Sequence, residues 1–196
     1  MGGKQAKPKD DRIPRVYWDA CIIISLIKNE QRLDPTETDA VRELKHKLDD
    51  GKIIGVTSAI TLTEVLDSEI PDGRRSELKK LQQMPDRFQF SAVDTKVAEK
   101  AHNIRDSYRK MPDKDEKTVS TPDAIHLATA IIQVCDVFYT FDEKDRDEKK
   151  TLGLLPLSGD VAIDNLEIRK PPPAQQRLLD ATWGRSAGET QGEGDA

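Results

Sequence analysis

The chain has 196 residues and a formal net charge of −5 at pH 7. This length suits one well-buried domain, and 36% hydrophobic against 34% charged residues, without long blocks of like charge, is compatible with a folded core. The negative charge argues against a protein that binds nucleic acid non-specifically over its whole surface, because such binding needs many Lys and Arg side chains.

Cysteine use and hydropathy indicate a reducing compartment. Cys21 and Cys135 both lie in apolar runs, which favours buried free thiols over a disulfide or a metal pair. The N-terminal sequence has no apolar stretch typical of a leader peptide, and the apolar run Cys21–Ile24 is far shorter than a membrane span. We therefore expect a cytoplasmic protein without a membrane-inserted segment.

The predicted elements alternate between strands and helices along the chain. From the N-terminus they are a flexible segment over residues 1–13, a strand over Arg15–Trp18, an apolar helix over Ala20–Lys28, a charged helix opened by Thr36 and ending at Gly51, a strand over Lys52–Thr57, and a helix capped by Ser58 that ends before Pro71. They continue with a helix over 73–83, a strand over 87–93, a helix that begins after Asp94 and ends near Pro112, a helix capped by Thr121 with Pro122 in its first turn, and strands over 136–140 and 166–170.

This alternation predicts a three-layer α/β/α fold with a central, mainly parallel sheet, because strands joined through helices form right-handed parallel crossovers. We place the folded domain at residues 14–170. In its last helix, the spacing of Ile125, Ala128 and Ile132 predicts the face that packs inward. The segment 171–196 opens on prolines and ends in Gly, Ser and Glu residues, which predicts a largely disordered tail.

Four acidic residues fall where a parallel sheet binds ligands, beyond the C-terminal ends of its strands. They are Asp19 after the first strand, Glu64 in the helix after the second strand, Asp123 in the first turn of the TPDAIHLATA helix, and Asp142 after the strand DVFYT. If they converge, their carboxylates repel one another, and a divalent cation is the natural compensator. An all-oxygen set without His or Cys in ligand spacing favours Mg²⁺ or Mn²⁺ over Zn²⁺. Such a site suits hydrolysis of a phosphodiester with one ion or two.

Each acid alone also has a simpler explanation. Asp123 suits a helix-dipole partner, Glu64 a solvent-facing helix position, and Asp142 a charged loop. Asp19 is the hardest to explain in this way, because an unpaired carboxylate between a strand and the apolar run CIII is costly to bury.

Together these contexts resemble the PIN domain family, and in particular its small single-domain nucleases of the VapC toxin type. The resemblance covers roughly residues 15–170 and rests on VYWDACIIISLI around Asp19, VTSAITLTEVL around Glu64, DAIHLATA from Asp123 and TFD ending at Asp142. It implies a metal-dependent endoribonuclease with these four acids as catalytic metal ligands, Mg²⁺ or Mn²⁺ as cofactor, and products with 5′-phosphate and 3′-hydroxyl ends. It also implies the toxin of a type II toxin–antitoxin pair, with an antitoxin partner and a homodimer.

Further residues are candidates for supporting the acidic cluster. The resemblance assigns Thr140 as a hydroxyl that helps to hold it, and Ser58 at the start of the Glu64 helix is another candidate for a supporting role. Asp145 stands where the family often has an aromatic residue, so it either assists Asp142 as a ligand or lies in a solvated loop. His126 lies one helical turn after Asp123, which favours a hydrogen bond behind the ligands, or simple packing, over a role as general base.

Other residues are candidates for RNA contact. Of Tyr17 and Trp18, one should belong to the core, and the sequence leaves open whether the other stacks on a base. A rim of cations would bind phosphates, although a solubilising surface role explains each of them as well: Arg74, Arg75, Lys79, Lys80, Arg105 and Arg109.

Two other functions are compatible with the sequence. A PIN-like scaffold that binds RNA or protein without cutting is the alternative, and the spacing of all four acids counts against it, since a scaffold has no need for repelling carboxylates. An aspartyl-phosphate phosphatase also places an Asp after its first strand. The haloacid-dehalogenase type has a second Asp two residues later, where this chain has Cys21.

Overall fold

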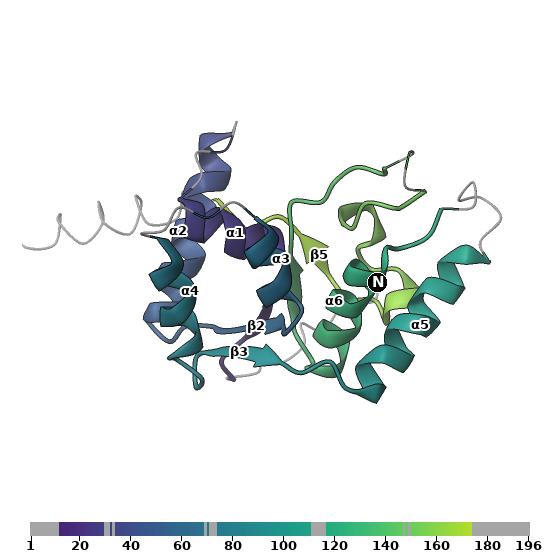
Figure 1. Cartoon of the computed structure of the whole chain (residues 1–196), viewed down its shortest axis with the longest axis horizontal. Coiled ribbons are helices and arrows are strands. Elements are labelled where there is room, and N and C mark those ends of the chain that lie inside the picture. The colour runs from purple at the N-terminus through teal and green to yellow at the C-terminus, as the bar shows by residue number, and fades with distance from the viewer. Residues whose placement is uncertain are drawn as a thin grey trace, which may run out of the picture.

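A sheet of parallel strands lies between two groups of helices in the computed structural model (Figure 1). The structure describes residues 12–29, 32, 34–68, 70, 74–110, 117–146, 148 and 150–173. Five strands lie in the order β3-β2-β1-β4-β5, and each neighbouring pair is parallel. Their bounds are Arg15–Trp18 for β1, Ile54–Ser58 for β2, Phe88–Ser91 for β3, Val137–Tyr139 for β4 and Ile168–Arg169 for β5. The predicted three-layer α/β/α fold with a parallel sheet is confirmed.

The helices form in the segments that the sequence predicts, with small shifts at their ends. They are α1 at Ala20–Lys28, α2 at Pro35–Asp49, α3 at Thr61–Asp67, α4 at Arg75–Gln82, α5 at Thr95–Arg109 and α6 at Thr121–Ile132, followed by 3₁₀ turns at Leu155–Leu157 and Val161–Ile163. None of the helices in the described part of the chain is long and apolar enough to cross a membrane.

The sheet separates two hydrophobic cores, because alternate residues of a strand point to opposite faces. Val16 and Trp18 of β1 pack with apolar residues of α1, α2, α3 and α4, whereas Tyr17 packs with Phe138 of β4 and apolar residues of α5 and α6. In Figure 1 the first group of helices lies on the left and α5 and α6 lie on the right. Tyr17 and Trp18 are both 0% exposed, so both belong to the core and neither is available to stack on a base.

Two helix caps lie slightly before their predicted positions. The side chain of Asp34 caps α2 and accepts a hydrogen bond from the backbone N–H of Thr36 at 2.9 Å, so Thr36 lies inside the helix. Ser120 caps α6, one residue before the predicted Thr121. In both cases a second residue with a capping side chain follows within two positions, so the sequence alone does not decide between the two.

Ser58 does not cap α3 as predicted. It is the last residue of β2, where it pairs with Ser91 of β3, and α3 begins at Thr61 without a side-chain cap. The predicted inward face of α6 also needs correction, because Ile132 is 36% exposed while Ala128 is buried. The flexible N-terminus predicted over 1–13 and the tail predicted over 171–196 lie almost wholly outside the described residues.

Candidate active site

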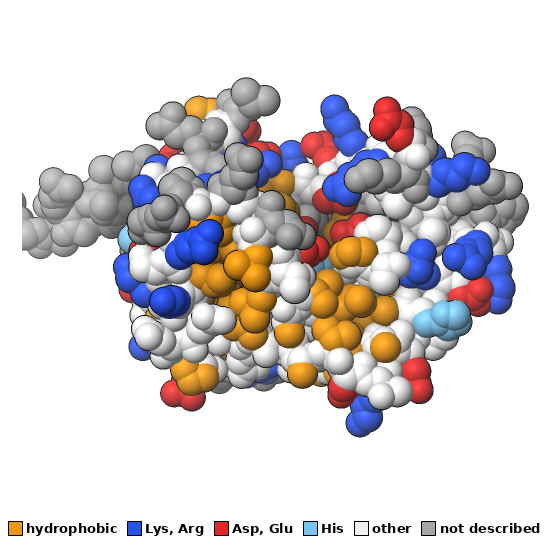
Figure 2. Space-filling model, in the orientation of Figure 1, with side chains coloured by type: hydrophobic (Ala, Val, Ile, Leu, Met, Phe, Trp, Pro, Cys, Tyr) orange, Lys and Arg blue, Asp and Glu red, His pale blue; other side chains and the backbone are white. Residues whose placement is uncertain are grey.

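The C-terminal ends of β1 and β4 lie side by side, at the point where the strand order reverses direction along the sheet. Open parallel sheets bind ligands at such a point. Here a pocket of about 370 Å³ is lined by the four predicted acids, Asp19, Glu64, Asp123 and Asp142. Figure 2 shows acidic side chains gathered at a hollow between the two groups of helices. The fold therefore brings together four carboxylates that are far apart in the sequence.

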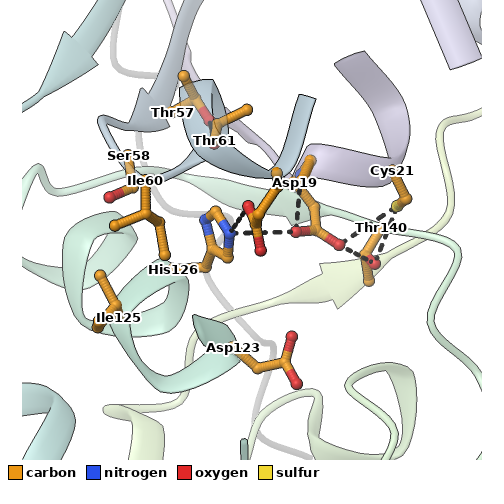
Figure 3. Close-up of polar contacts among 12 residues, drawn as sticks. Asp19, Cys21, Thr57, Ser58, Ile60, Thr61, Asp123, Ile125, His126 and Thr140 are labelled. Carbon is orange, nitrogen blue, oxygen red and sulfur yellow. Dashed lines mark hydrogen bonds and ion pairs between the residues drawn. The ribbon is translucent and has the colours of Figure 1, made fainter. Parts of the chain in front are cut away.

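Asp19 is held in one orientation at the start of α1. Its Oδ1 accepts from the backbone N–H of Ala20 at 2.8 Å, and its Oδ2 accepts from the hydroxyl of Thr140 at 2.7 Å and the thiol of Cys21 at 3.2 Å (Figure 3). Burial, reinforced by the charge of Asp19, raises the pKa of Cys21 well above its ordinary value, so the thiol keeps its proton and donates. The chain turns from β1 into α1 at Asp19, which makes this residue both the helix cap and the side chain at the strand end.

Glu64 is held by the buried ring of His126. Nε2 of His126 lies 2.8 Å from Oε2 of Glu64, and Nδ1 lies 2.7 Å from the hydroxyl of Tyr17. The Tyr17 oxygen also accepts the N–H of Ser58 at 2.9 Å, which directs its own proton to Nδ1 of the neutral ring and leaves Nε2 as the donor to Glu64. Burial alone lowers the pKa of His126, but the bond to Glu64 and the charge of Asp19 outweigh it and raise the pKa above its ordinary value. In either protonation state, Nε2–H donates to Glu64.

Asp123 lies in the first turn of α6, where its carboxylate contacts the hydroxyl of the helix cap Ser120. Burial raises the pKa of Asp123, and the nearby charge of Asp19 raises it further, while the bond from Ser120 acts against both. The carboxylate is thus only partly compensated by the protein.

Asp142 follows β4 and completes the acidic pocket. Its backbone N–H donates to Oγ1 of Thr140 at 3.0 Å, and its Oδ1 accepts from Nη2 of Arg146 at 3.3 Å. Burial raises the pKa of Asp142 to about 6; Arg146 opposes this shift, and the charges of Asp123 and Asp19 add to it. Thr140 therefore links Asp19 and Asp142 through a single hydroxyl.

The donor chemistry of the pocket fits Mg²⁺ or Mn²⁺. Its acids offer only oxygen ligands, and the raised pKa values of Asp123 and Asp142 indicate negative charge that the protein leaves undercompensated. Among the described residues, no three or more His, Cys, Asp or Glu side chains are arranged to hold one metal ion. Asp123 and Asp142 each have one carboxylate oxygen in contact with a protein donor, Ser120 and Arg146 respectively.

Several residues predicted for the site lie elsewhere. Ser58 contributes its N–H, while its Oγ is buried without a hydrogen-bond partner. Asp145 does not line the pocket, and its Oδ1 accepts from the backbone N–H of Gly153 at 2.9 Å, which orders the loop after β4. The six predicted rim cations do not line it either; Arg75 and Lys79 line a separate, mainly apolar pocket beside α3 and α4.

The pocket also contains residues that the sequence analysis missed. Arg32 and Arg146 both line it. Arg146 follows Asp142 by four residues, but this segment is not helical, so the spacing rule for helices does not reveal the pair. No local pattern reveals Arg32, or the bond between Tyr17 and His126, which joins residues 109 positions apart.

The fold and the site together define an α/β protein with a cluster of carboxylates at the topological switch point of a parallel sheet. The family model of the PIN domain matches residues 16–148, a stretch that contains all four acids. The chain therefore belongs to the PIN domain family. Members of this family are generally nucleases, and they typically use divalent metal ions.

The chain is similar to several solved structures, among them FitAcB from Neisseria gonorrhoeae, with 22% identity over 80% of this chain and 97% of that one and a TM-score of 0.47. A toxin–antitoxin complex from Klebsiella pneumoniae shows 19% identity over 81% and 98% of the two chains and a TM-score of 0.45. VapBC2 from Rickettsia felis, bound to a DNA fragment from its promoter, shows 14% identity over 80% and 98% and a TM-score of 0.49. No curated protein matches the sequence significantly.

Proposed function

We propose that this protein is a Mg²⁺- or Mn²⁺-dependent endoribonuclease. The proposal rests on one observation: four carboxylates line one pocket at the switch point of the sheet, and burial with neighbouring negative charge raises the pKa of Asp123 and Asp142. A binding scaffold gains nothing from such repulsion, whereas a cation-dependent nuclease needs it. Membership of the PIN family supports the same reaction class.

The four acids would hold the cation, and neighbouring side chains would keep them in position. When bound, a divalent ion of this kind supplies Lewis acidity and neutralises negative charge on the phosphodiester. Thr140 holds the orientation of Asp19, and His126 holds that of Glu64. Arg146 pairs with Asp142 from a half-exposed position, so it is free to turn to the substrate when Asp142 binds the cation.

A cleavage assay tests this proposal. The wild-type protein should cut single-stranded RNA in Mg²⁺ or Mn²⁺ but not in EDTA, and leave 5′-phosphate ends. Asp19→Asn and Asp123→Asn should each abolish cleavage and retain the circular dichroism spectrum of the wild type. Asp145→Asn is the matched control, because it makes the same chemical change outside the pocket and should retain activity.

Two results would count against the proposal. One is metal-dependent cleavage that survives in both Asp19→Asn and Asp123→Asn. The other is metal binding by the wild type without cleavage of any RNA tested, which would favour a non-catalytic PIN-like scaffold.

We further infer that the protein is the toxin of a toxin–antitoxin pair that acts in the cytoplasm, with an antitoxin and a second copy of itself as partners. A mainly apolar pocket of about 190 Å³ beside α3 and α4 supports a protein partner, and Leu66 at its edge is 70% exposed. Leu66→Asp should abolish association with the product of an adjacent reading frame, or self-association in light scattering, without loss of cleavage. Unchanged association in both assays would contradict a partner at this surface.

A further inference from the structure

Arg32 lies where two pockets meet. It lines the acidic pocket, and it also lines a neighbouring pocket of about 260 Å³ together with Arg42 on α2. The nuclease function proposed above does not involve Arg32. Its place at the border of the carboxylates nevertheless puts it beside any chain that enters the acidic pocket.

Arg32 is held by one backbone contact and two side-chain contacts. Its Nε donates to Oε2 of Glu37 at 2.7 Å, and its backbone N–H donates to Oγ1 of Thr38 at 3.0 Å. Its guanidinium carbon lies over the Phe141 ring, 3.8 Å from the centre of that ring, which is a cation–π contact. A side chain held in this way loses little further conformational freedom when it binds a ligand.

The contacts of Arg32 leave its two Nη groups for a ligand. Within the described part of the chain, neither Nη atom has a hydrogen-bond partner, whereas Nε is engaged. Glu37 does not belong to Arg32 alone, because its Oε1 lies 3.1 Å from Nζ of Lys170. Lys170 also lies 3.2 Å from Oε2 of Glu143, so it does not depend on Glu37 alone. Glu37 contacts Arg32 only through Nε, and the Nη side of the guanidinium stays open to a ligand.

This geometry suits a phosphate group. A fixed, planar guanidinium with free Nη–H groups matches two phosphate oxygens at once. A polyanionic strand is repelled by the four carboxylates next to Arg32, so it needs a fixed cation beside them to enter. Arg146 is less well prepared for this role, because its Nη2 is the group that pairs with Asp142, whereas Arg32 pairs with Glu37 through Nε.

We propose that Arg32 forms a phosphate subsite for single-stranded RNA, next to the phosphate that lies over the acidic cluster. Its Nη groups bind this neighbouring phosphate, and the strand continues into the pocket that Arg32 shares with Arg42. The subsite rests on the proposed ribonuclease function and names how that same site would bind its substrate.

Binding of a short fluorescein-labelled single-stranded RNA, followed by anisotropy at several salt concentrations, tests the subsite. Ca²⁺ replaces Mg²⁺ so that binding is read independently of cleavage. Arg32→Gln keeps a planar end group for Phe141 but removes the charge. It should weaken binding about tenfold and reduce the slope of log Kd against log salt by about 0.7, the value for one phosphate contact on a single strand.

Two variants serve as controls. Lys52→Gln removes one positive charge just before β2, at the N-terminal end of that strand and outside the acidic pocket. It should leave the affinity and the salt slope unchanged. Arg32→Lys keeps the charge, so it should retain the salt slope while losing part of the affinity.

An unchanged salt slope in Arg32→Gln would overturn the subsite, even if this variant lost thermal stability. That result would mean that Arg32 has a structural role or binds the carboxylates of a protein partner. The two proposals fail separately. If the protein binds RNA through Arg32 but cuts no RNA, the nuclease proposal fails and the subsite stands. If the protein cuts RNA but Arg32→Gln leaves the salt slope unchanged, the subsite fails and the nuclease proposal stands.

Discussion

The four carboxylates of the acidic pocket form two pairs that differ in how firmly the protein holds them, and we call these pairs the Asp19–Glu64 wall and the Asp123–Asp142 wall. On one wall, Asp19 accepts hydrogen bonds on both oxygens, and Glu64 is bound by a ring that is itself fixed by Tyr17. On the other wall, Asp123 and Asp142 have raised pKa values, and their partners are a cap hydroxyl and a half-exposed arginine.

This difference suggests a division of labour between the walls. The Asp19–Glu64 wall is oriented by donors that belong to the fold, so it needs no ligand to take up its geometry. The Asp123–Asp142 wall carries charge that is costly to bury, and a bound cation would remove that cost. Substitutions in the first wall should therefore destabilise the protein, whereas neutral substitutions in the second should stabilise it when no metal is present.

The largest effect is expected at Thr140, which belongs to both walls. Thr140→Val removes the donor to Asp19 and the acceptor of the Asp142 N–H, and should lower the free energy of unfolding by about 3 kcal/mol, because charged and buried groups lose their partners. Thr140→Ser keeps the hydroxyl and should lose far less. Chemical denaturation measures both variants, and equal losses would show that packing of the methyl group matters, not the hydrogen bonds.

A smaller loss is expected at Tyr17, which supports the first wall from behind. Tyr17→Phe leaves the Ser58 N–H and Nδ1 of His126 without a partner, and should cost about 2 kcal/mol and lower the cleavage rate because Glu64 is less well positioned. Tyr139→Phe is the control on the neighbouring strand, since its hydroxyl makes only a 3.5 Å contact. If both variants behave alike in denaturation and cleavage, Tyr17 and His126 do not position Glu64.

The smallest effect, of opposite sign, is expected at Asp142. Its pKa is raised from 3.8 to about 6 by burial first, so the folded state favours the protonated form; that stabilising contribution is present at acidic pH and is lost as the pH rises through about 6. Asp142→Asn cannot ionise, so in EDTA it should be more stable than the wild type by about 1 kcal/mol near pH 7, after screening by solvent at this partly open side chain. The gain should vanish below about pH 4. If Asp142→Asn is more stable than the wild type by the same amount at every pH, the extra stability comes from packing and not from the ionisation of Asp142.

Most of the fold could be predicted from the sequence because its signals are local. Asp94 caps α5 as expected, and β1 and α1 have their predicted bounds. The errors arise where tertiary pairing decides between neighbouring options. Ser58 has the side chain of a cap, but pairing with β3 extends β2 through it.

The acids of the site could be foreseen for a related reason. Parallel strands bring their C-terminal ends to one edge, so an acid after each of two strands implies a shared pocket. The supports of these acids could not be foreseen, because Tyr17 and Arg32 act through contacts with His126 and Phe141, far away in the sequence. Their roles depend on which side of the sheet each residue faces and on how a loop folds back.

Calorimetric titration with Mn²⁺ is the most direct test of the claim that a cation completes the Asp123–Asp142 wall. We predict saturable binding that releases protons near pH 6, where Asp142 is partly protonated, and releases almost none near pH 8, because ligands must lose their protons to bind a metal. Asp123→Asn should weaken this binding strongly, and Asp145→Asn should leave it unchanged. Absence of saturable binding, or equal affinity in Asp123→Asn and the wild type, would contradict the account.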